Sequence, residues 1–500
     1  MKTFERGAGI LMPISSMPSP YGIGTMGRDA YEFVDFLREC NHKYWQVLPL
    51  GPTSFGDSPY QGFSTFAGNP YFIDLETLIE EGLLKKEYVE RFDWGNDAAH
   101  IAYDKVYQSR YIVLREAYKN SEHKTSPEYI TFLKENADWI DDYALFMAIK
   151  QYYKDADWSL WDDELRFRKP EALEKYTELL SDDIDFYKFL QFKFFEQWNK
   201  LKDYANDKGI EVIGDIPIYV AYDSADVWVH TKEFVLDENL APIKVAGVPP
   251  DAFTDLGQKW GNPLYDWEKM EQNGFSWWRK RMAAAAQMYD IIRIDHFLGV
   301  VKYYTIPADN PDAREGEYVK GPGSKLTDVI NQAIGSKKLI AEDLGVDIPE
   351  ATKLLNDNGY PGMKVLEFAF GGDRKNVHLP HNYTTTNCVV YGGTHDNETL
   401  MGYFNERNDW ELGYAYDYLD TRDKRKMVDQ IFRLAYGSIA DVVIFQTQDI
   451  LKLDNKARTN LPSSLGKNWQ WRLLKGQLGT QQKQDLRYLA SVFGREMQSK

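Results

Sequence analysis

The sequence predicts an α/β protein built as a (β/α)8 barrel. Eight short apolar runs end in polar residues or in Gly/Pro clusters, at residues 9–16, 44–52, 211–220, 291–299, 338–345, 363–370, 388–396 and 441–449. Helical patterns lie between most of them, for example at 351–359 and 423–437. Strands that alternate with helices pair in parallel, and eight such units close a barrel. An open doubly wound sheet is the alternative, although no GxGxxG motif follows the first run.

A long stretch separates the second run from the third, far longer than one crossover helix requires. Residues 141–156 and 181–207 within it have helical patterns. In the second of these, apolar residues fall at i, i+3 or i+4 steps, as in a packed helix: Tyr187, Leu190, Phe194, Trp198 and Leu201. We therefore expect a mostly helical insertion at residues 76–205, with its aromatic side chains in the core.

Residues 221–275 form a second irregular segment. Pro249, Pro250 and several glycines predict a long loop over one end of the barrel, and loops of this length are commonly functional. Residues 481–493 predict a final helix, and nothing near the end resembles a β-sandwich domain. The expected organisation is one catalytic barrel, residues 1–500, with an active-site loop insertion at 221–275.

The composition narrows the range of partners and compartments. The formal net charge is −17 and no long basic run is present, so neither a nucleic acid nor an anionic membrane is a fitting partner. The two cysteines, Cys40 and Cys388, fit a reducing cytosol rather than a disulfide framework. The N-terminus lacks the pattern of a secretory signal, and no segment approaches the ~20 apolar residues of a membrane helix. We expect a cytoplasmic protein with a neutral or positive ligand.

Acidic side chains follow the third, fourth, fifth and seventh predicted strands. They are Asp215, Asp295 beside His296, Glu342 beside Asp343, and Asp396 beside His395. Active sites of such barrels form at the C-terminal ends of the strands. Carboxylates there suit either a metal ion or glycoside chemistry. Nearby loops carry Tyr60, Phe253, Trp260 and Phe368, which suit stacking on sugar rings. They favour glycoside chemistry and leave the metal site open as an alternative.

The fourth run, IIRIDHFLGV at residues 291–300, places Arg293 and Asp295 on one face of an apolar strand. An isolated charge would be costly there. A nearby cation keeps a carboxylate ionised, so we expect Arg293 to compensate Asp295.

Seven motifs in register carry a family resemblance. They are DSPYQGFSTFAGNPYFIDL (57–75), GDIPIYVAYDSADVW (214–228), AGVPPDAFTDLGQKWGNPLYDW (246–267), RIDHFLG (293–299), AEDLG (341–345), PGMKVLEFAF (361–370) and GTHDN (393–397). They resemble those of amylomaltases, the 4-α-glucanotransferases of glycoside hydrolase family 77. The resemblance runs from about residue 7 to about residue 475.

This resemblance implies a retaining double displacement on α-1,4-glucans as donor and acceptor, with glucose as a further acceptor, no metal and no cofactor. It implies that Asp295 is the nucleophile, Glu342 the general acid/base and Asp396 the residue that holds sugar hydroxyls in the transition state. The expected substrate-binding residues are Tyr60, Asp215, Asp251, Phe253, Gln258, Trp260, Arg293, His296, Phe368, His395 and Asn468. Asn468 belongs to a loop, 460–472, of which only the GxNWxWR core fits the family well.

Simpler interpretations of these residues stay open from the sequence alone. Asp343 could replace Glu342 in its role, and Asp215 could serve only as an acceptor for backbone N–H groups. His296 and His395 could only orient a neighbour, and Phe253 and Trp260 could only pack their loop. A retaining α-glucan hydrolase with the same carboxylates is the alternative enzyme, and a non-catalytic glucan-binding protein is a third hypothesis.

Overall fold

The computed structural model describes residues 4–54, 56–250, 254–345 and 348–497. Eight parallel strands form one sheet: β1 (Gly7–Leu11), β2 (Tyr44–Gln46), β3 (Glu211–Pro217), β6 (Ile291–Asp295), β9 (Lys338–Ala341), β10 (Gly362–Val365), β11 (Cys388–Tyr391) and β12 (Val442–Gln446). The order is β10-β11-β12-β1-β2-β3-β6-β9.

This sheet curls into a nearly closed barrel. The first strand pairs with the last, with Ile10 opposite Phe445. At the other seam, the backbone N–H of Ala341 in β9 donates to the carbonyl of Pro361, just before β10, at 3.0 Å. This contact between the two edge strands, β9 and β10, excludes an open doubly wound sheet. The predicted (β/α)8 fold is confirmed.

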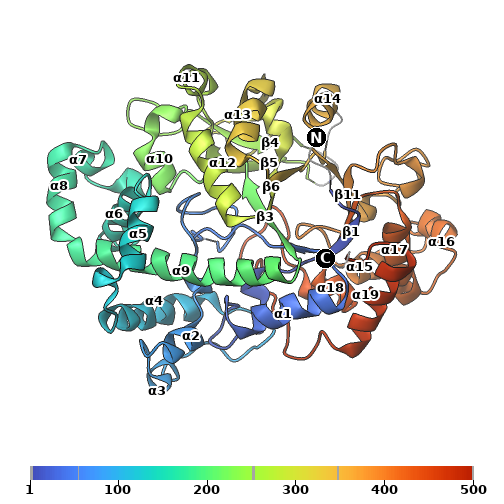
Figure 1. The fold of residues 1–500 in the computed structure, drawn as a ribbon. Coiled ribbons are helices and arrows are strands. Elements are labelled where there is room, and N and C mark those ends of the chain that lie inside the picture. The colour runs from blue at the N-terminus through green and yellow to red at the C-terminus, as the bar shows by residue number, and fades with distance from the viewer. Residues whose placement is uncertain (1–3, 55, 251–253, 346–347, 498–500) are drawn as a thin grey trace.

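Helices follow or surround the strands (Figure 1). Around the barrel they are α1 (Arg28–Glu39), α12 (Ser276–Met288), α13 (Ser324–Ile334), α14 (Pro349–Asn358), α15 (Leu400–Glu406), α16 (Gly413–Leu419) and α17 (Lys424–Gly437). After β12, the described residues form α18 (Thr447–Ile450), α19 (Thr480–Val492) and their connecting segments. Helices are thus found at the three positions 351–359, 423–437 and 481–493 where the sequence predicts them.

The alternation of side chains along each strand decides which residues reach the site. Ile213 on β3, Ile291 on β6 and Ile340 on β9 belong to one buried cluster inside the barrel. Ile292 and Ile294 on β6 instead join the cluster that packs against the surrounding helices. Because successive side chains point to opposite faces, every second residue after the inward isoleucines also points inward. These residues include Asp215, Arg293, Asp295 and Glu342.

Between β2 and β3, the chain forms a group of helices at one side of the barrel (Figure 1). They are α2 (Leu75–Glu80), α3 (Lys86–Val89), α4 (Tyr103–Lys119), α5 (Pro127–Glu135), α6 (Ile140–Tyr152), α7 (Asp163–Arg166), α8 (Pro170–Leu179) and α9 (Ser181–Asp207). The predicted helices 141–156 and 181–207 correspond to α6 and α9. The apolar stripe of α9, from Tyr187 to Leu201, is buried as expected.

The segment 221–275, expected to be an irregular loop, contains regular structure. It holds α10 (Ala225–Val229), β4 (Lys244–Val248), β5 (Gln258–Pro263) and α11 (Trp267–Gln272). The two strands join β7 (Lys302–Pro307) and β8 (Glu317–Lys320) in an antiparallel sheet of order β5-β4-β7-β8. The local sequence did not suggest strands, because β4 pairs with a strand that follows β6.

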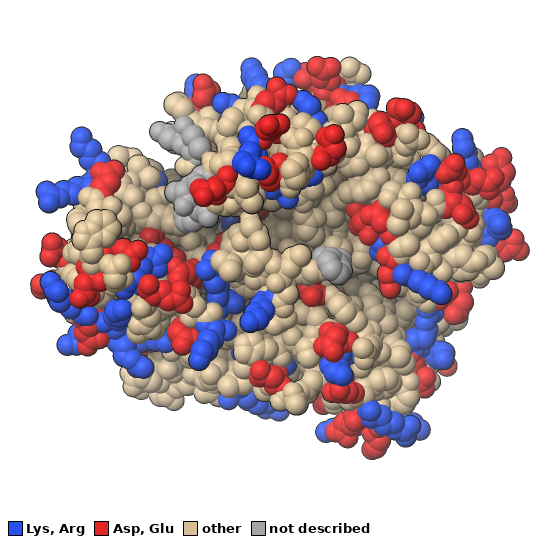
Figure 2. Space-filling model, turned by 180° about the vertical axis from the view of Figure 1, so that it is seen from behind, with Lys and Arg blue, Asp and Glu red and all other residues tan. Residues whose placement is uncertain are grey.

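The described part of the chain contains no helix long and apolar enough to cross a membrane. Despite the net charge of −17, the face of the molecule drawn in Figure 2 carries acidic and basic side chains interspersed. A hollow near the centre of this face is lined mostly by residues other than Lys, Arg, Asp and Glu (Figure 2). Nothing on this face forms the extended basic surface that a polyanion would require.

Candidate active site

Arg293 lies at the centre of the candidate site and contacts two carboxylates. It is opposite Asp215 in the pairing of β3 with β6. Its Nη1 lies 2.7 and 2.6 Å from the two carboxylate oxygens of Asp215, and its Nη2 lies 3.0 Å from Oδ1 of Asp295. Both Arg293 and Asp215 are almost fully buried, whereas the Asp295 side chain remains 28% exposed. Asp295 is therefore the carboxylate of this triad that a ligand can reach.

The electrostatics of Asp295 differ from the simple compensation predicted from the sequence. Burial raises its pKa, the charge of Arg293 lowers it, and the charges of Asp215 and Asp396 raise it again, to about 6. Arg293 offsets only part of the effect because it also faces Asp215. Asp295 is nevertheless an anion at neutral pH.

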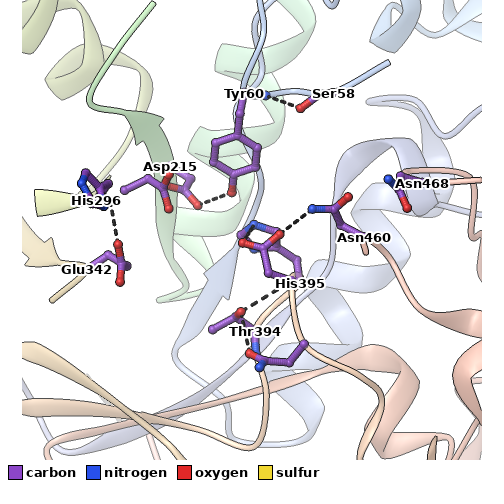
Figure 3. A network of polar contacts seen from close by, with 12 residues as sticks. Ser58, Tyr60, Asp215, His296, Glu342, Thr394, His395, Asn460 and Asn468 are labelled. Carbon is purple, nitrogen blue, oxygen red and sulfur yellow. Dashed lines mark hydrogen bonds and ion pairs between the residues drawn. The ribbon is translucent and has the colours of Figure 1, made fainter. Parts of the chain in front are cut away.

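Glu342 follows β9 and is held by backbone donors. Its Oε2 accepts from the N–H of His296 at 2.7 Å (Figure 3). Its Oε1 accepts from the N–H of Leu344, also at 2.7 Å. His296 has a left-handed backbone, with φ 51°, and its N–H faces Glu342. Burial and then the charge of Asp295 raise the pKa of Glu342 to about 8. Glu342 thus keeps its proton at a pH where Asp295 has lost its own.

The adjacent Asp343 has a different task. Its Oδ1 accepts from the backbone N–H of Met363 in β10 at 2.7 Å, across the barrel seam. Its carboxylate also lies against Gly362, where an added Cβ would come within 2.2 Å of it. Asp343 therefore joins β9 to β10, which makes Glu342 the better candidate for chemistry.

His395 and Asp396 follow β11 and form a third acidic position. Nδ2 of Asn460 donates to Oδ1 of Asp396 at 2.6 Å, and Nε2 of His395 lies 3.3 Å from its Oδ2 (Figure 3). Burial would raise the pKa of Asp396, but the charge of His395 and these hydrogen bonds outweigh it and lower the pKa to about 2. The Asp396 side chain is 42% exposed, so an ionised carboxylate is open to a ligand.

Aromatic rings line the space around these carboxyl groups. The hydroxyl of Tyr60 donates to Oδ2 of Asp215 at 2.8 Å, and its ring stacks on His395 with centroids 5.1 Å apart and planes at 15°. On β5, the ring of Trp260 meets His296 edge-on at 4.9 Å. Trp260 also donates through Nε1 to Oε1 of Gln258 at 3.1 Å. Such flat, partly polar surfaces suit the faces of sugar rings.

Phe368 and Asn468 show contacts with neighbouring loop residues. Phe368 is half-buried after β10, with its ring 5.5 Å from His378. Asn468 bonds to its own loop, accepting from Leu461 and donating to Ser464. Asp251 and Phe253 lie outside the described residues.

Sequence reasoning missed Asn460 and Arg458. Arg458 donates through Nη2 to the carbonyl of Asp396 at 2.6 Å and through Nε to the carbonyl of Asn460 at 2.7 Å. Asn460 begins the loop 460–472 that the family pattern singled out, so the loop was identified but not this residue. The described residues hold no group of three or more His, Cys, Asp or Glu side chains suited to a metal ion.

The arrangement has the features of a site for glycosyl transfer. It combines an accessible anion at Asp295, a buried acid that retains its proton at Glu342 and a second exposed anion at Asp396. Two carboxyl groups whose surroundings separate their pKa values can act as nucleophile and proton donor.

Comparison with known proteins agrees with this chemistry. A model of glycoside hydrolase family 77, described as 4-alpha-glucanotransferase, matches residues 12–477. A 4-alpha-glucanotransferase of Clostridium butyricum is 46% identical over 97% of this chain and 100% of its own length. Another, of Thermus thermophilus, is 43% identical over 98% of this chain and 99% of its own length.

Solved structures agree with both fold and family. Amylomaltase from Streptococcus agalactiae, in complex with acarbose, superposes with a TM-score of 0.95 at 40% identity, covering 99% of this chain and 100% of that one. Amylomaltase from Corynebacterium glutamicum gives a TM-score of 0.80 at 15% identity, over 97% of this chain and 75% of that one, a likeness that shows the fold alone. The resemblance of the seven motifs is confirmed, and the chain belongs to glycoside hydrolase family 77, the 4-alpha-glucanotransferases.

Proposed function

We propose that this enzyme transfers segments of α-1,4-glucan from one chain to the 4-hydroxyl of another, or of glucose, by a retaining double displacement. The observation that carries the proposal is a pair of carboxyl groups in different surroundings: Asp295 is partly exposed beside Arg293, and Glu342 is buried and held by two backbone N–H groups. Between the pKa of Asp295, about 6, and that of Glu342, about 8, the site holds a nucleophile and a proton donor together.

In the first half of the reaction, a carboxylate oxygen of Asp295 attacks the anomeric carbon as the bond from that carbon to the 4-oxygen breaks. The proton of Glu342 passes to the departing 4-oxygen. In the second half, Glu342 is a carboxylate and takes the proton of the acceptor 4-hydroxyl, whose oxygen displaces Asp295 from the anomeric carbon. Two inversions retain the α configuration.

The remaining residues hold the sugar and the charges. Asp396 is ionised and exposed, so it can accept hydrogen bonds from sugar hydroxyls as positive charge develops on the ring. Tyr60 offers a ring held between Asp215 and His395. Arg293 fixes the orientation of Asp295. We further assign sugar contacts to the side chains Asp251, Phe253, Gln258, Trp260, His296, Phe368, His395 and Asn468. Asp215, expected from the sequence to bind sugar, is fully buried and instead holds Arg293 and Tyr60 in place.

We place this activity in the cytoplasm, on maltooligosaccharides, starch or glycogen. A neutral glucan needs no basic surface, and the two cysteines, Cys40 and Cys388, are both buried and unpaired. The residues described account for the proposed steps without a metal or an organic cofactor. Of the acidic residues that face the ligand, Asp295 acts as the nucleophile, Glu342 as the acid and Asp396 as a hydrogen-bond acceptor.

Incubation with maltotriose, followed by separation of the products by size, tests the proposal. Transfer yields glucose together with a ladder of longer oligosaccharides, while the total number of reducing ends stays constant. A rise in reducing ends in step with the loss of maltotriose, with no longer products, would establish the retaining hydrolase instead. Unchanged maltotriose would leave only a glucan-binding protein.

A further inference from the structure

Two aromatic side chains of the site come from distant parts of the chain. Tyr60 lies in the segment after β2, and its ring stacks on His395 at the end of β11. Trp260 lies on β5 of the antiparallel sheet, and its ring meets His296 at the end of β6. Each ring is therefore fixed to a different strand end of the barrel, and their separation depends on what joins the two segments.

A pair of amide side chains joins them. Nε2 of Gln61 donates to Oδ1 of Asn262 at 3.0 Å, and Nδ2 of Asn262 lies 3.5 Å from Oε1 of Gln61, also in donor geometry. Gln61 directly follows Tyr60, and Asn262 is two residues beyond Trp260 on the same strand. The link thus lies next to both rings in the sequence.

Asn262 is the fixed end of this link. It is 3% exposed, and its Nδ2 also donates to the carbonyl of Val220, beyond β3, at 2.8 Å. Gln61 lies in a short turn, where its own N–H donates to the carbonyl of Ser58 at 3.1 Å. The amide pair therefore ties the turn that carries Tyr60 to a buried anchor on the barrel side of β5.

We propose that Gln61 and Asn262 are positioning residues that hold Tyr60 and Trp260 at a fixed separation, and that this separation determines whether a glucan or water ends the reaction. The inference rests on the glucan transfer proposed above. A glucan acceptor must be bound and aligned between formed surfaces before it reacts, whereas water needs no such alignment. If the turn that carries Tyr60 moves relative to Trp260, the rate of transfer falls more than the rate of hydrolysis.

The ratio of hydrolysis to transfer is the appropriate measurement. Both products arise from one glycosyl-enzyme intermediate, so their ratio does not depend on how much enzyme is folded or active. With maltotriose, transfer conserves the number of reducing ends and hydrolysis increases it. Counting reducing ends against longer oligosaccharides gives the ratio directly.

The variant Gln61→Met keeps the length of the side chain and removes both of its amide contacts. Loss of a net hydrogen bond corresponds to about a two- to tenfold change, so we expect the hydrolysis-to-transfer ratio to rise by about that factor. Asn262→Ala, which also loses the contact with Val220, should raise the ratio at least as much. The double variant should be no worse than Asn262→Ala, because the two residues act through one link.

The matched control is another amide pair, outside the site. Nδ2 of Asn331 on α13 donates to Oδ1 of Asn358 on α14 at 2.7 Å, and neither residue adjoins an aromatic side chain of the site. Asn331→Met should leave the ratio at the wild-type value.

An unchanged ratio in both Gln61→Met and Asn262→Ala would overturn the inference, as would an equal rise in Asn331→Met. Failure of the underlying function would look different. In that case the wild-type enzyme itself would give no longer oligosaccharides, and no ratio could be formed for any variant.

Discussion

Replacing Glu342 with glutamine removes the proposed proton donor and nearly keeps its shape. The carboxyl group is buried, accepts from the N–H groups of His296 and Leu344 at 2.7 Å, and has a pKa raised to about 8 by burial and the charge of Asp295. The N–H groups of an amide are far too weakly acidic to protonate the departing 4-oxygen. General acid catalysis contributes ~10²–10⁴-fold, so kcat on maltotriose should fall by about that factor, or ~3–5 kcal/mol in activation free energy.

A substrate that needs no proton separates this role from a structural one. Fluoride departs from α-maltosyl fluoride without protonation, so Glu342→Gln should release a burst of fluoride at a rate within about tenfold of wild type. The burst reports the first half of the reaction alone, before Glu342 is needed as a base. Rapid-quench measurement of fluoride, set beside steady-state turnover of maltotriose, gives the comparison.

The pH profile supplies a second readout. Below about pH 6, Asp295 gains a proton and loses its nucleophilic form, and above about pH 8 Glu342 loses the proton it must give. The profile of kcat/KM should be a bell centred near pH 7, and Glu342→Gln should lose only the alkaline limb. Asp343→Asn, which retains an acceptor for the N–H of Met363, should keep both limbs. A fluoride burst as impaired as maltotriose turnover, or an alkaline limb that survives in Glu342→Gln, would refute the assignment.

Three further outcomes are expected. Asp295→Ala should lose turnover by several orders of magnitude while calorimetry still detects glucan binding. Tyr60→Phe keeps the ring against His395 and loses the hydrogen bond to Asp215, so kcat/KM should fall only about fivefold, against a far larger loss for Tyr60→Ala. Burial raises the pKa of Asp449 to about 7, so the wild-type protein loses stability as the pH rises from 4 to 7, where the carboxyl group is ionised in the unfolded chain but not in the folded one. Relative to wild type, the unfolding free energy of Asp449→Asn should therefore increase by roughly 2–4 kcal/mol between pH 4 and pH 7, measured by urea unfolding. The same difference from wild type at pH 4 and at pH 8 would contradict this.

The barrel could be predicted from sequence because its strands are buried on both faces. Runs such as 291–299 are then almost continuously apolar, and each carries its signal locally. The predicted runs extend past the strands, since β2 ends at Gln46 within the run 44–52 and the loop after it is apolar too. Strands β4 and β5 were not predicted because their pairing depends on β7, which follows β6 in the chain.

The site could be predicted at the level of residues but not of their partners. The pattern of charged residues at strand ends singled out Asp295, Glu342 and Asp396, which the structure brings to one end of the barrel. Spacing along one strand suggested that Arg293 serves Asp295, yet in the structure it also faces Asp215 on β3, the neighbouring strand of the barrel. Partners that meet only across the barrel, such as Asn460 and Asp396, leave no pattern in a single segment.

Pairing of β1 with β12 has a consequence for folding during synthesis on the ribosome. From the moment residues Gly7–Leu11 emerge, one edge of that strand has no neighbour until Val442–Gln446 has been translated. An unpaired apolar edge is a template for association with other chains. Nascent chains halted before residue 442 should therefore depend on chaperones, and a permuted gene that starts at the seam between β9 and β10 would let β12 and β1 be made in immediate succession.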